Sequence, residues 1–344
     1  MISERKVKFA IVGCGHIAKK HIESIQNSEI AELAAICDTN PERLKEFSEQ
    51  YNVEGFSSIE EMLQQRKEIE VVNICTPSGL HKPLAMIAAN YKKHIVVEKP
   101  IALTMEDAEA IIAVCKENNV KLSVVHPNRF RPAMQMLKNT MANKLLGKIS
   151  HVNATVRWNR NQAYYDQAAW RGTKQFDGGV LMNQAIHNLD LMIWLFGPIK
   201  EVQSYTATRL RQIESEDVAV SVVKFEEGFL GVIEAAVTIY PKNLEESISV
   251  FGEKGSVIIG GPTANWVKHI QIEAYNQEET DSLVNGIHND PYGISGHSII
   301  INDMAHCVIN PNRYPVVSGE NGKEALKLVL AVYESSELNR PVTL

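Results

Sequence analysis

The sequence predicts an α/β protein with two domains: an N-terminal domain built on a doubly wound parallel sheet, and a C-terminal α/β domain with a large open, mostly antiparallel sheet. Three observations support this prediction. Apolar, strand-like runs alternate with helix-like segments through the first 126 residues. Beyond Val202, alternating runs are joined by short connections that contain glycine. The chain has 344 residues, which is enough for two domains of ordinary size.

Strands and helices alternate in the N-terminal part. The strand-like runs are residues 7–12, 33–37, 71–75, 95–97 and 122–125. A helix is predicted from His16 to Ile25, and Asn40 with Pro41 predicts another helix start, since asparagine is a good N-cap and proline suits the first helical position. Strands separated by helices indicate βαβ units and therefore a parallel sheet. His126-Pro127 ends the last strand, so we predict domains at 1–126 and 127–344.

The C-terminal part has a different order of predicted strands and helices. Residues 148–158 alternate like a strand, and residues 178–196 are predicted to form one apolar helix. The predicted hairpins pair 218–225 with 229–239 and 247–251 with 256–259. We expect one open sheet with helices on one face. Because strands such as 218–222 carry apolar side chains on both faces, the other face is expected to form a homodimer or homotetramer.

Composition excludes several classes of protein. Hydrophobic residues make up 44% and charged residues 22%, as in ordinary globular chains. The net charge of -6 and the lack of a basic stripe argue against a nucleic-acid partner. No apolar run approaches the ~20 residues of a membrane helix, and the first residues lack the apolar stretch of a signal peptide. Five widely spaced cysteines without a CxxC pair indicate buried thiols in a reducing cytoplasm.

The first turn carries a dinucleotide-binding pattern. Gly13-Cys14-Gly15-His16-Ile17-Ala18 fits G-x-G-x-x-A between a strand and a helix. The first glycine permits the turn, the second lets the backbone approach a pyrophosphate, and the helix N-terminus faces the phosphates. Asp38 lies twenty residues beyond Ala18, where a carboxylate accepts hydrogen bonds from ribose hydroxyls and repels a 2′-phosphate. The alternative is an ordinary turn and a surface aspartate. The spacing favours NAD as the cofactor.

Further motifs resemble one family. They are Gly13-Cys14-Gly15, Cys75-Thr76-Pro77-Ser78-Gly79-Leu80-His81, Glu98-Lys99-Pro100, Trp170-Arg171-Gly172, Gly178-Gly179 with His187, and Gly319-Glu320-Asn321-Gly322. Together they resemble the Gfo/Idh/MocA oxidoreductases over essentially the whole chain. The resemblance implies an N-terminal Rossmann domain, a C-terminal domain with a large open sheet, a dinucleotide cofactor, and a sugar or cyclitol substrate.

Lys99 and His187 are the candidate catalytic residues. Lys99 follows an apolar strand, at the sheet edge where doubly wound folds bind ligands, and an ammonium there can stabilise an alkoxide. His187 shares a helical stripe with Asn183 and Asp190, and imidazole is suited to taking an alcohol proton near neutral pH. A surface lysine and a buried core histidine are the ordinary alternatives, which the family motifs disfavour. The sequence leaves open which of the two is the base.

One position departs from the family pattern. Many members carry aspartate four residues before this histidine, whereas this chain has Asn183. An amide donates and accepts hydrogen bonds but takes no proton at this pH, so a carboxylate base at this position is in doubt.

The resemblance also implies cofactor contacts. Thr76, Pro77 and His81 are expected to line the cofactor, Glu98 to orient the nicotinamide side, and Trp170 and Arg171 to reach the cofactor, although a core anchor and a rim salt bridge would explain the last two equally well. The predicted cofactor-binding residues are Gly13, Gly15, His16, Ile17, Asp38, Thr76, Pro77, His81, Glu98, Lys99, Asn128, Trp170 and Arg171. The remaining histidines show no metal-ligand spacing, so no catalytic metal is predicted.

A narrower resemblance concerns the substrate. Residues 164–173, 182–184 and 240–245 resemble the UDP-N-acetyl-2-amino-2-deoxy-D-glucuronate 3-dehydrogenases of bacterial surface-polysaccharide synthesis. This implies a cytoplasmic enzyme that removes hydride from C3 of a nucleotide sugar acid. The alternatives are a free-sugar or inositol dehydrogenase and a non-catalytic NAD-binding regulator. The predicted substrate-binding residues are Lys99, Asn183, His187, Arg157, Arg160, Lys242 and Asn243, although solvated charges at strand ends would explain the basic ones as well.

Overall fold

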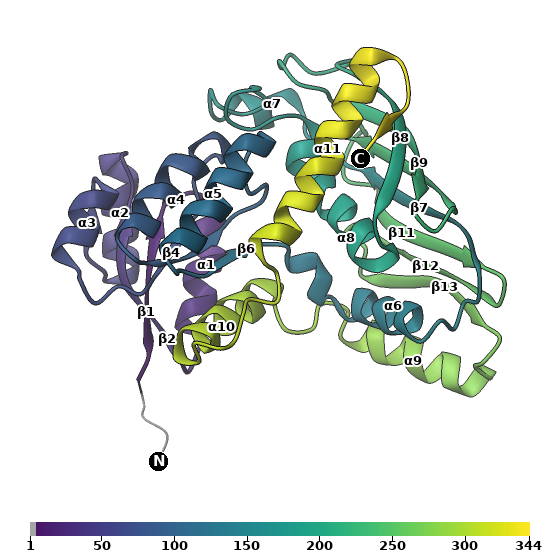
Figure 1. The fold of residues 1–344 in the computed structure, drawn as a ribbon, viewed down its shortest axis with the longest axis horizontal. Helices are drawn as coiled ribbons and strands as arrows, with labels where there is room; N and C mark the ends of the chain where they lie inside the picture. Colours follow the sequence, from purple (N-terminus) through teal and green to yellow (C-terminus); the bar gives the residue numbers. More distant parts are fainter. Residues whose placement is uncertain (1–4) are drawn as a thin grey trace. The chain divides into compact units, whose positions relative to one another are not determined.

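The computed structural model describes residues 5–344, and the chain forms two compact units (Figure 1). Unit 1 contains the chain as far as Pro127 together with Ser295–Lys323, and unit 2 contains Asn128–Ile294 and Glu324–Leu344. The first boundary lies one residue from the predicted one. The prediction that everything after residue 126 belongs to the second domain is wrong, because the chain returns to unit 1 at Ser295.

Long-range contacts explain the return to unit 1. The strand β6 (Leu122–Val124) receives the returning segment, since the Val124 amide donates to the carbonyl oxygen of Val317 and Ser123 forms a β-bridge with Ser318. Gly322 packs directly on Val124, where a Cβ atom would lie 2.7 Å from a valine methyl carbon. Contacts of this kind join residues almost two hundred positions apart, so local sequence patterns do not predict them.

Unit 1 is a doubly wound sheet with strand order β3-β2-β1-β4-β5-β6, every neighbouring pair being parallel. Its strands are β1 (Val7–Val12), β2 (Ala31–Cys37), β3 (Gly55–Phe56), β4 (Val71–Ile74), β5 (His94–Val97) and β6. Its helices are α1 (His16–Gln26), α2 (Pro41–Tyr51), α3 (Ile59–Gln65), α4 (His81–Asn90), α5 (Met105–Glu117) and α10 (Gly296–Ile309). Strand order reverses between β1 and β4, which is where such sheets bind ligands at the strands' carboxyl ends.

Local signals set several of these elements. The strands are nearly continuous apolar runs because the sheet is buried on both faces, as the four buried residues of β4 illustrate. The Asn40 side chain accepts a hydrogen bond from the Arg43 amide and Pro41 begins α2, as predicted. All five cysteines are buried and none forms a disulfide.

Unit 2 is built on a sheet with strand order β13-β12-β11-β7-β10-β9-β8-β14. Its strands are β7 (Ile149–Arg157), β8 (Ile199–Ala207), β9 (Val218–Phe225), β10 (Leu230–Ala236), β11 (Glu245–Gly252), β12 (Gly255–Gly260), β13 (Trp266–Ile272) and β14 (Val342–Thr343). Only β7 and β10 pair in parallel, so the sheet is mostly antiparallel as predicted. Both predicted hairpins, β9–β10 and β11–β12, are confirmed.

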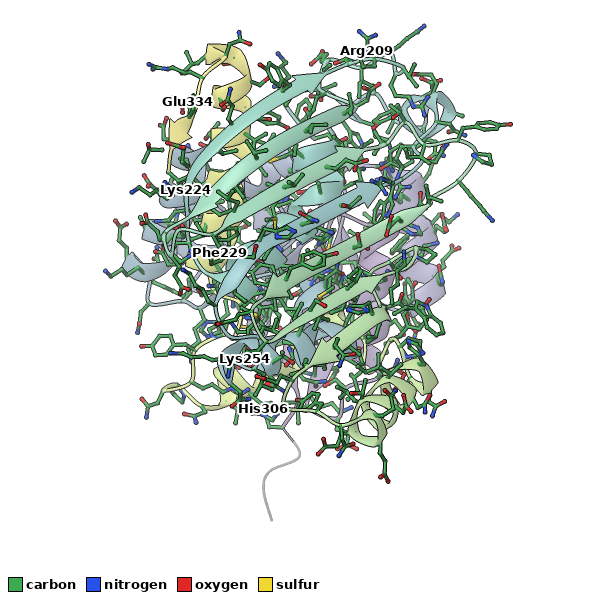
Figure 2. All side chains as sticks on the ribbon, turned by 90° about the vertical axis from the view of Figure 1, so that its right-hand side faces the viewer. Arg209, Lys224, Phe229, Lys254, His306 and Glu334 are labelled. Carbon is green, nitrogen blue, oxygen red and sulfur yellow. The ribbon has the colours of Figure 1, made fainter. Side chains whose placement is uncertain are left out.

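The helices of unit 2 leave one face of this sheet open. They are α6 (Pro132–Ala142), α7 (Gln162–Asp166), α8 (Ile186–Phe196), α9 (Gln277–Asn289) and the part of α11 (Gly319–Leu338) that follows Lys323. The helix α8 packs on β7 and β11, and α6 packs on β12. Figure 2 looks onto the opposite face, where side chains rather than helices cover the strands. No helix among residues 5–344 has the length and apolar character to cross a membrane.

The predicted single helix over 178–196 is wrong in detail. Gly178 has a positive φ of +81°, which L side chains rarely adopt, and the chain enters the helix only after it. Residues Leu181–Ala185 form a π-helical turn that continues into α8. Such turns are rare and occur frequently at functional sites.

Candidate active site

The glycine turn of unit 1 forms an open cradle after β1. Gly13 has a φ of +94° and lies so close to β4 that a Cβ atom would be 2.9 Å from the carbonyl carbon of Cys75. Gly15 is the N-cap of α1, and a Cβ atom there would meet nothing within 4 Å. No side chain caps α1 and its first turn has no acidic residue, so its N–H groups remain available to an anion. His16 and Ile17, which begin α1, are exposed and half-buried respectively.

Asp38 lies at the end of β2, beside the glycine turn. Its Oδ2 atom accepts a hydrogen bond of 2.8 Å from the Cys14 amide, and its Oδ1 atom accepts one of 2.8 Å from the Asn40 amide. The Arg43 guanidinium, which the sequence reading missed, lies 3.5 Å from Oδ2. A carboxylate has about four acceptor positions, so Asp38 can fix the turn and still accept from ribose hydroxyls.

The turn after β4 contains an unpartnered buried hydroxyl. The Thr76 Oγ1 atom has no hydrogen-bond partner among residues 5–344, although it is buried. Pro77 next to it caps the short 3-10 helix Ser78–Leu80. A buried polar atom without a partner is costly unless a ligand supplies one. Together with the open glycine cradle and the uncapped α1, this hydroxyl fits a bound dinucleotide.

His81 is a link between two turns. Its ring is fully buried, with Nδ1 2.8 Å from the carbonyl oxygen of Pro100 and Nε2 3.1 Å from that of Thr76. Burial lowers the pKa of His81, although these two carbonyl contacts oppose the shift. With both ring nitrogens facing protein carbonyls, His81 joins the two turns, and the cofactor contact implied by the resemblance stays a prediction.

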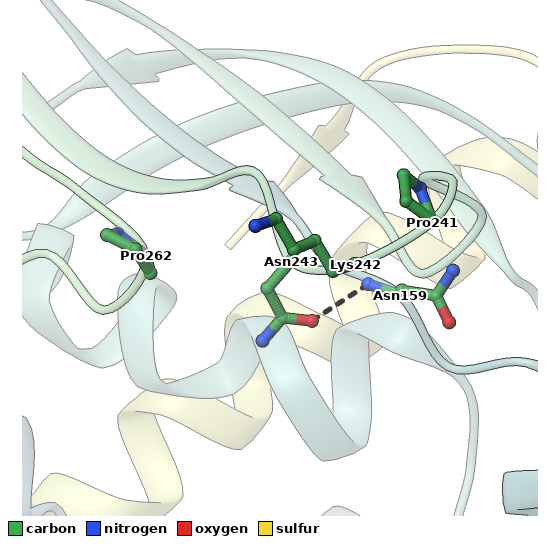
Figure 3. Close-up of a pocket in the computed structure, with 5 residues that line it drawn as sticks. All are labelled: Asn159, Pro241, Lys242, Asn243 and Pro262. Atoms are coloured by element: carbon green, nitrogen blue, oxygen red, sulfur yellow. Dashed lines mark hydrogen bonds between the residues drawn. The ribbon is translucent and has the colours of Figure 1, made fainter.

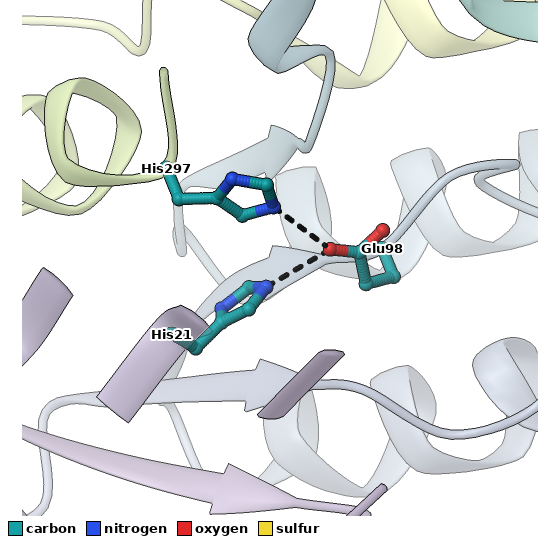
Figure 4. A group of neighbouring side chains, drawn as sticks. All are labelled: His21, Glu98 and His297. Carbon is teal, nitrogen blue, oxygen red and sulfur yellow. Dashed lines mark hydrogen bonds and ion pairs between the residues drawn. The ribbon is translucent and has the colours of Figure 1, made fainter. Parts of the chain in front are cut away.

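Glu98 and its neighbours form a buried polar cluster (Figure 4). The Glu98 Oε1 atom lies 2.9 Å from His21 Nε2 and 3.6 Å from His297 Nε2. Asn73 Nδ2 lies 2.9 Å from the other ring nitrogen of His21. Burial alone would raise the pKa of Glu98, but hydrogen bonds from His21 and His297 outweigh it and hold that pKa well below its usual range.

The same three side chains could receive a cation. One ligand atom each from His21, Glu98 and His297 lies within 4.8 Å of the others, in the part of the chain that the structure describes. Sequence spacing gave no sign of this group, because its members come from α1, the residue after β5, and α10. Direct hydrogen bonding already explains the arrangement, and it serves to fix Glu98.

Lys99 follows directly and is held through its backbone. Its amide donates a hydrogen bond of 3.2 Å to Glu98 Oε2, and the Lys99–Pro100 peptide bond is cis. The side chain is half-buried. The cluster around Glu98 therefore sets the position of the candidate catalytic lysine.

In unit 2, the π-helical turn and α8 carry Asn183 and His187. Both are half-buried. The Asn183 amide nitrogen donates a hydrogen bond to Asp177 Oδ1, while Asp177 Oδ2 accepts one of 2.8 Å from the Gly172 amide. A carboxylate is thus present beside Asn183, supplied by Asp177 instead of residue 183 itself.

Asp190 docks α8. It accepts two hydrogen bonds from the Arg129 guanidinium, of 2.8 Å from Nε and 2.6 Å from Nη2, and both side chains are buried. Fork-shaped pairs of this kind are strong and geometrically specific. Of the two sequence expectations for Asp190, docking the helix and orienting His187, these contacts support the first.

Trp170 and Arg171 belong to an aromatic–arginine stack. The Arg171 guanidinium lies 4.3 Å from the Tyr164 ring centroid and 4.7 Å from that of Trp170. Arg171 also donates to the Tyr164 hydroxyl, and its Nε atom has no partner among residues 5–344 although it is buried. The Arg160 guanidinium also lies over the Tyr164 ring, 5.3 Å from its centroid. These arginines are positioned by rings and carry unused hydrogen-bonding capacity.

A hollow of about 490 Å³ lies next to Arg160 and is shown in Figure 3. Its lining residues are Asn159, Pro241, Lys242, Asn243 and Pro262. The Asn243 Oδ1 atom accepts from the Asn159 amide at 2.9 Å and from Arg160 Nη1 at 3.3 Å. Two predicted substrate-binding residues, Lys242 and Asn243, are therefore brought together at one concave surface.

Arg157 does not belong to this group. Its guanidinium donates two hydrogen bonds to Glu234, of 2.8 and 2.6 Å, and a third of 2.9 Å to Glu245. Two carboxylates therefore already pair with Arg157, and its binding to the substrate stays a prediction. Asn128 donates a hydrogen bond of 3.2 Å to the buried Glu246, and its predicted contact with the cofactor stays a prediction.

Comparisons with known proteins agree with this architecture. The model of the oxidoreductase family with an NAD-binding Rossmann fold matches residues 7–126, and that of the GFO/IDH/MocA C-terminal domain matches residues 134–258. The chain is 26% identical to myo-inositol 2-dehydrogenase from Thermotoga maritima over 98% of both chains. It is 28% identical to UDP-N-acetylglucosamine 3-dehydrogenase from Acidithiobacillus ferrooxidans over 56% of this chain and 55% of that one.

Two solved structures are especially similar. The WlbA dehydrogenase from Bordetella pertussis, in complex with NADH and UDP-GlcNAcA, is 37% identical with a TM-score of 0.94, covering 100% of this chain and 99% of that one. The WlbA enzyme from Chromobacterium violaceum, with the same ligands, is 38% identical with a TM-score of 0.93, covering 100% and 97%. The protein is therefore an NAD-dependent sugar dehydrogenase that belongs to the Gfo/Idh/MocA oxidoreductase family.

Proposed function

We propose that the protein oxidises the C3 hydroxyl of UDP-N-acetylglucosaminuronic acid, in the cytoplasm, during nucleotide-sugar synthesis for bacterial surface polysaccharides such as the lipopolysaccharide O-antigen. The observation that carries this proposal is the whole-chain similarity to two enzymes crystallised with UDP-GlcNAcA, at 37% and 38% identity. The myo-inositol 2-dehydrogenase relative supports the second candidate, a free-sugar or inositol dehydrogenase.

The hollow of unit 2 suits an anionic sugar nucleotide. Lys242 is exposed and forms no ion pair or hydrogen bond among residues 5–344, and Arg160 has no carboxylate partner there. Charge-assisted hydrogen bonds from such groups recognise carboxylates and diphosphates. Asn243 adds an amide at the same surface. We assign Arg160, Lys242 and Asn243 to the anionic parts of the substrate.

Lys99 and His187 supply the acid–base chemistry in this proposal. NAD, when bound in the cradle of unit 1, would supply the hydride acceptor. If His187 takes the hydroxyl proton, the Lys99 ammonium stabilises the negative charge that develops on the C3 oxygen; if Lys99 is the base, it takes that proton as the neutral amine. Asn183 contributes hydrogen bonds only, since an amide does not accept a proton near neutral pH. The presence of both groups argues against a regulator that binds NAD without catalysis.

A single-turnover experiment tests the proposal. Enzyme with bound NAD is mixed with UDP-N-acetylglucosaminuronic acid, UDP-N-acetylglucosamine or myo-inositol, and formation of NADH is followed. Single turnover reveals reduction even where NADH leaves slowly. We expect reduction with the acid and roughly tenfold or greater loss with the neutral sugar, because a site built for an anion keeps an unpaired cation. Reduction by inositol alone would establish the second candidate, and no reduction by any of the three would favour the regulator.

We also propose that unit 2 forms a homodimer or homotetramer through the open face of its sheet. Exposed apolar side chains lie on adjacent strands there, with Tyr205 on β8, Val220 and Val222 on β9, and Leu230 and Val232 on β10. Val222 is directly opposite Val232 in the sheet register, so the apolar surface is continuous. A contiguous apolar surface of this kind typically marks a protein interface.

A further inference from the structure

Glu216 is a buried carboxyl group under the turn that presents the candidate catalytic histidine. Its Oε1 atom accepts a hydrogen bond of 2.8 Å from the Leu181 amide, the first residue of the π-helical turn. Its own carbonyl oxygen accepts a hydrogen bond of 3.0 Å from the Val180 amide. Both donors are at the start of the helix, where amides lack partners within the helix and no side chain of the turn caps them.

Two residues from other parts of the chain, Tyr333 and Gly179, set the position of this carboxyl group. The Tyr333 hydroxyl, on α11 after the chain has returned to unit 2, donates a hydrogen bond of 3.0 Å to the same Oε1 atom. Gly179 leaves the space that Glu216 fills, since a Cβ atom at Gly179 would lie 2.2 Å from Glu216 Oε2. A side chain of any size at residue 179 would therefore displace the carboxyl group.

The π-helical turn that Glu216 holds contains Asn183 and leads into α8, which contains His187. The Asn183 amide donates a hydrogen bond of 3.0 Å to the Gly179 carbonyl oxygen, and His187 follows one helical turn later in α8. A π-helical turn changes the angular position of every side chain beyond it relative to an α-helix. The direction of His187 therefore depends on the turn at Leu181 keeping its geometry.

We propose, building on the proposed function, that Glu216 is a positioning residue, which together with Tyr333 fixes the π-helical turn so that Asn183 and His187 point correctly for the reaction. Glu216 itself does not contact the substrate or the cofactor in this proposal. Burial disfavours the charged form of this group, so the turn is held most firmly while Glu216 is neutral and its Oε1 atom accepts from both donors.

The ionisation of Glu216 changes near neutral pH. Burial raises the pKa of Glu216 to about 7, against the opposing effect of hydrogen bonds from the Leu181 amide and Tyr333. Tyr333 and Asp217 are the titratable groups that act on Glu216; Asp217 adds to the rise by charge repulsion. The pKa of Tyr333 is well above its usual value, owing to burial and then to Glu216, so this hydroxyl stays a donor.

The test compares the wild type with Glu216→Gln, Tyr333→Phe and the control Glu334→Gln, which removes an exposed carboxylate from the same helix as Tyr333. Hydrogen exchange of residues 178–187 is measured without substrate, and kcat and KM are measured from about pH 6 to about pH 8. Glutamine keeps a neutral acceptor at every pH, so for Glu216→Gln at about pH 8 we expect roughly tenfold slower exchange than for the wild type, a kcat no lower than that of the wild type, and unchanged NAD affinity. Near pH 6, where the wild-type carboxyl group is also neutral, the two proteins should converge.

Several outcomes separate this proposal from the proposed function. Tyr333→Phe removes a donor to Glu216, so it should speed exchange and lower kcat, and Glu334→Gln should match the wild type. Equal exchange of residues 178–187 in wild type and Glu216→Gln at the higher pH would overturn the positioning role, whatever the substrate is. If the wild type oxidises none of the tested sugars, the proposed function fails, while the exchange comparison still decides the role of Glu216.

Discussion

At the scale of single residues, two buried glutamates of this protein behave in opposite ways. Hydrogen bonds from His21 and His297 keep the pKa of Glu98 well below its usual value despite burial, whereas burial raises that of Glu216 to about 7. The difference follows from the partners: Glu98 faces two imidazoles, and Glu216 faces a hydroxyl, an amide and the like charge of Asp217. Both groups support a candidate catalytic residue without being one.

These shifts predict opposite effects of pH on stability. The folded state holds a proton on Glu216 more tightly than the unfolded chain, so its contribution to stability falls as pH rises from about 4.5 to about 7, by up to about 3 kcal/mol. Glu98 contributes stability above its ordinary pKa and loses it as pH falls through its lowered folded pKa. Denaturant unfolding at several pH values measures the free energy of unfolding. Glu216→Gln should remove its decrease between about pH 4.5 and about pH 7, and Glu98→Gln should weaken its decrease at acid pH. Unchanged profiles in both variants would contradict these assignments.

Asp38 predicts the choice of cofactor. Its carboxylate accepts from ribose hydroxyls and repels a 2′-phosphate, so NAD should bind more tightly than NADP. Replacing Asp38 by Ser should weaken NAD binding roughly tenfold and reduce the preference for NAD over NADP, because a charged acceptor is lost. Fluorescence titration of both cofactors measures this, with Arg43→Ala as the control for the neighbouring cation, which should weaken NADP binding more than NAD binding. Equal or tighter NADP binding by the wild type would refute the prediction.

At the scale of elements, sequence reasoning succeeded where a signal is local. The glycine turn at Gly13, the Asn40 cap and the β9–β10 hairpin each depend on a few adjacent residues, and the structure has all three. It missed partners that are distant in the sequence. Arg157 pairs with Glu234 and Glu245 across the sheet, and the π-helical turn depends on Glu216, thirty-five residues beyond Leu181. The glycine at residue 179 was the sequence signal for this contact, because only a residue without a Cβ atom leaves room for the Glu216 carboxyl group.

The packing at Gly179 gives a prediction with an internal control. A Cβ atom at Gly179 would lie 2.2 Å from Glu216 Oε2, so Gly179→Ala should cost about 1–3 kcal/mol and perturb the π-helical turn. Gly286, inside α9, has nothing within 4 Å of its Cβ position, and Gly286→Ala should stabilise the protein by up to about 1 kcal/mol. Urea denaturation of both variants measures the two changes. A loss of stability at Gly286 similar to that at Gly179 would show that the cost does not come from the contact between residue 179 and Glu216.

At the scale of the whole molecule, each unit carries part of the predicted chemistry. The glycine turn and Lys99 lie in unit 1, and His187 and the hollow at Lys242 lie in unit 2. The return of Ser295–Lys323 to unit 1 also brings His297 to Glu98, so the C-terminal third helps to build the site of the N-terminal domain. A prediction that divides the chain at a single point, as ours does at residue 126, separates His297 from the Glu98 that it contacts.

The open face of the unit 2 sheet predicts the oligomeric state. Tyr205 and Leu230 are 65% and 58% exposed, and the apolar surface that they share with Val220, Val222 and Val232 has no cover within residues 5–344. Burying such a surface contributes roughly 25 cal/mol for each Å² of apolar area, whereas a lysine at its centre would have to be desolvated. We expect a dimer or tetramer by light scattering at micromolar concentration, and Val222→Lys should shift it toward monomer. Leu210→Lys, which replaces a similarly exposed apolar residue outside these strands, should leave the assembly unchanged. A monomeric wild type would exclude this interface, and an equal effect of both substitutions would place the contact elsewhere.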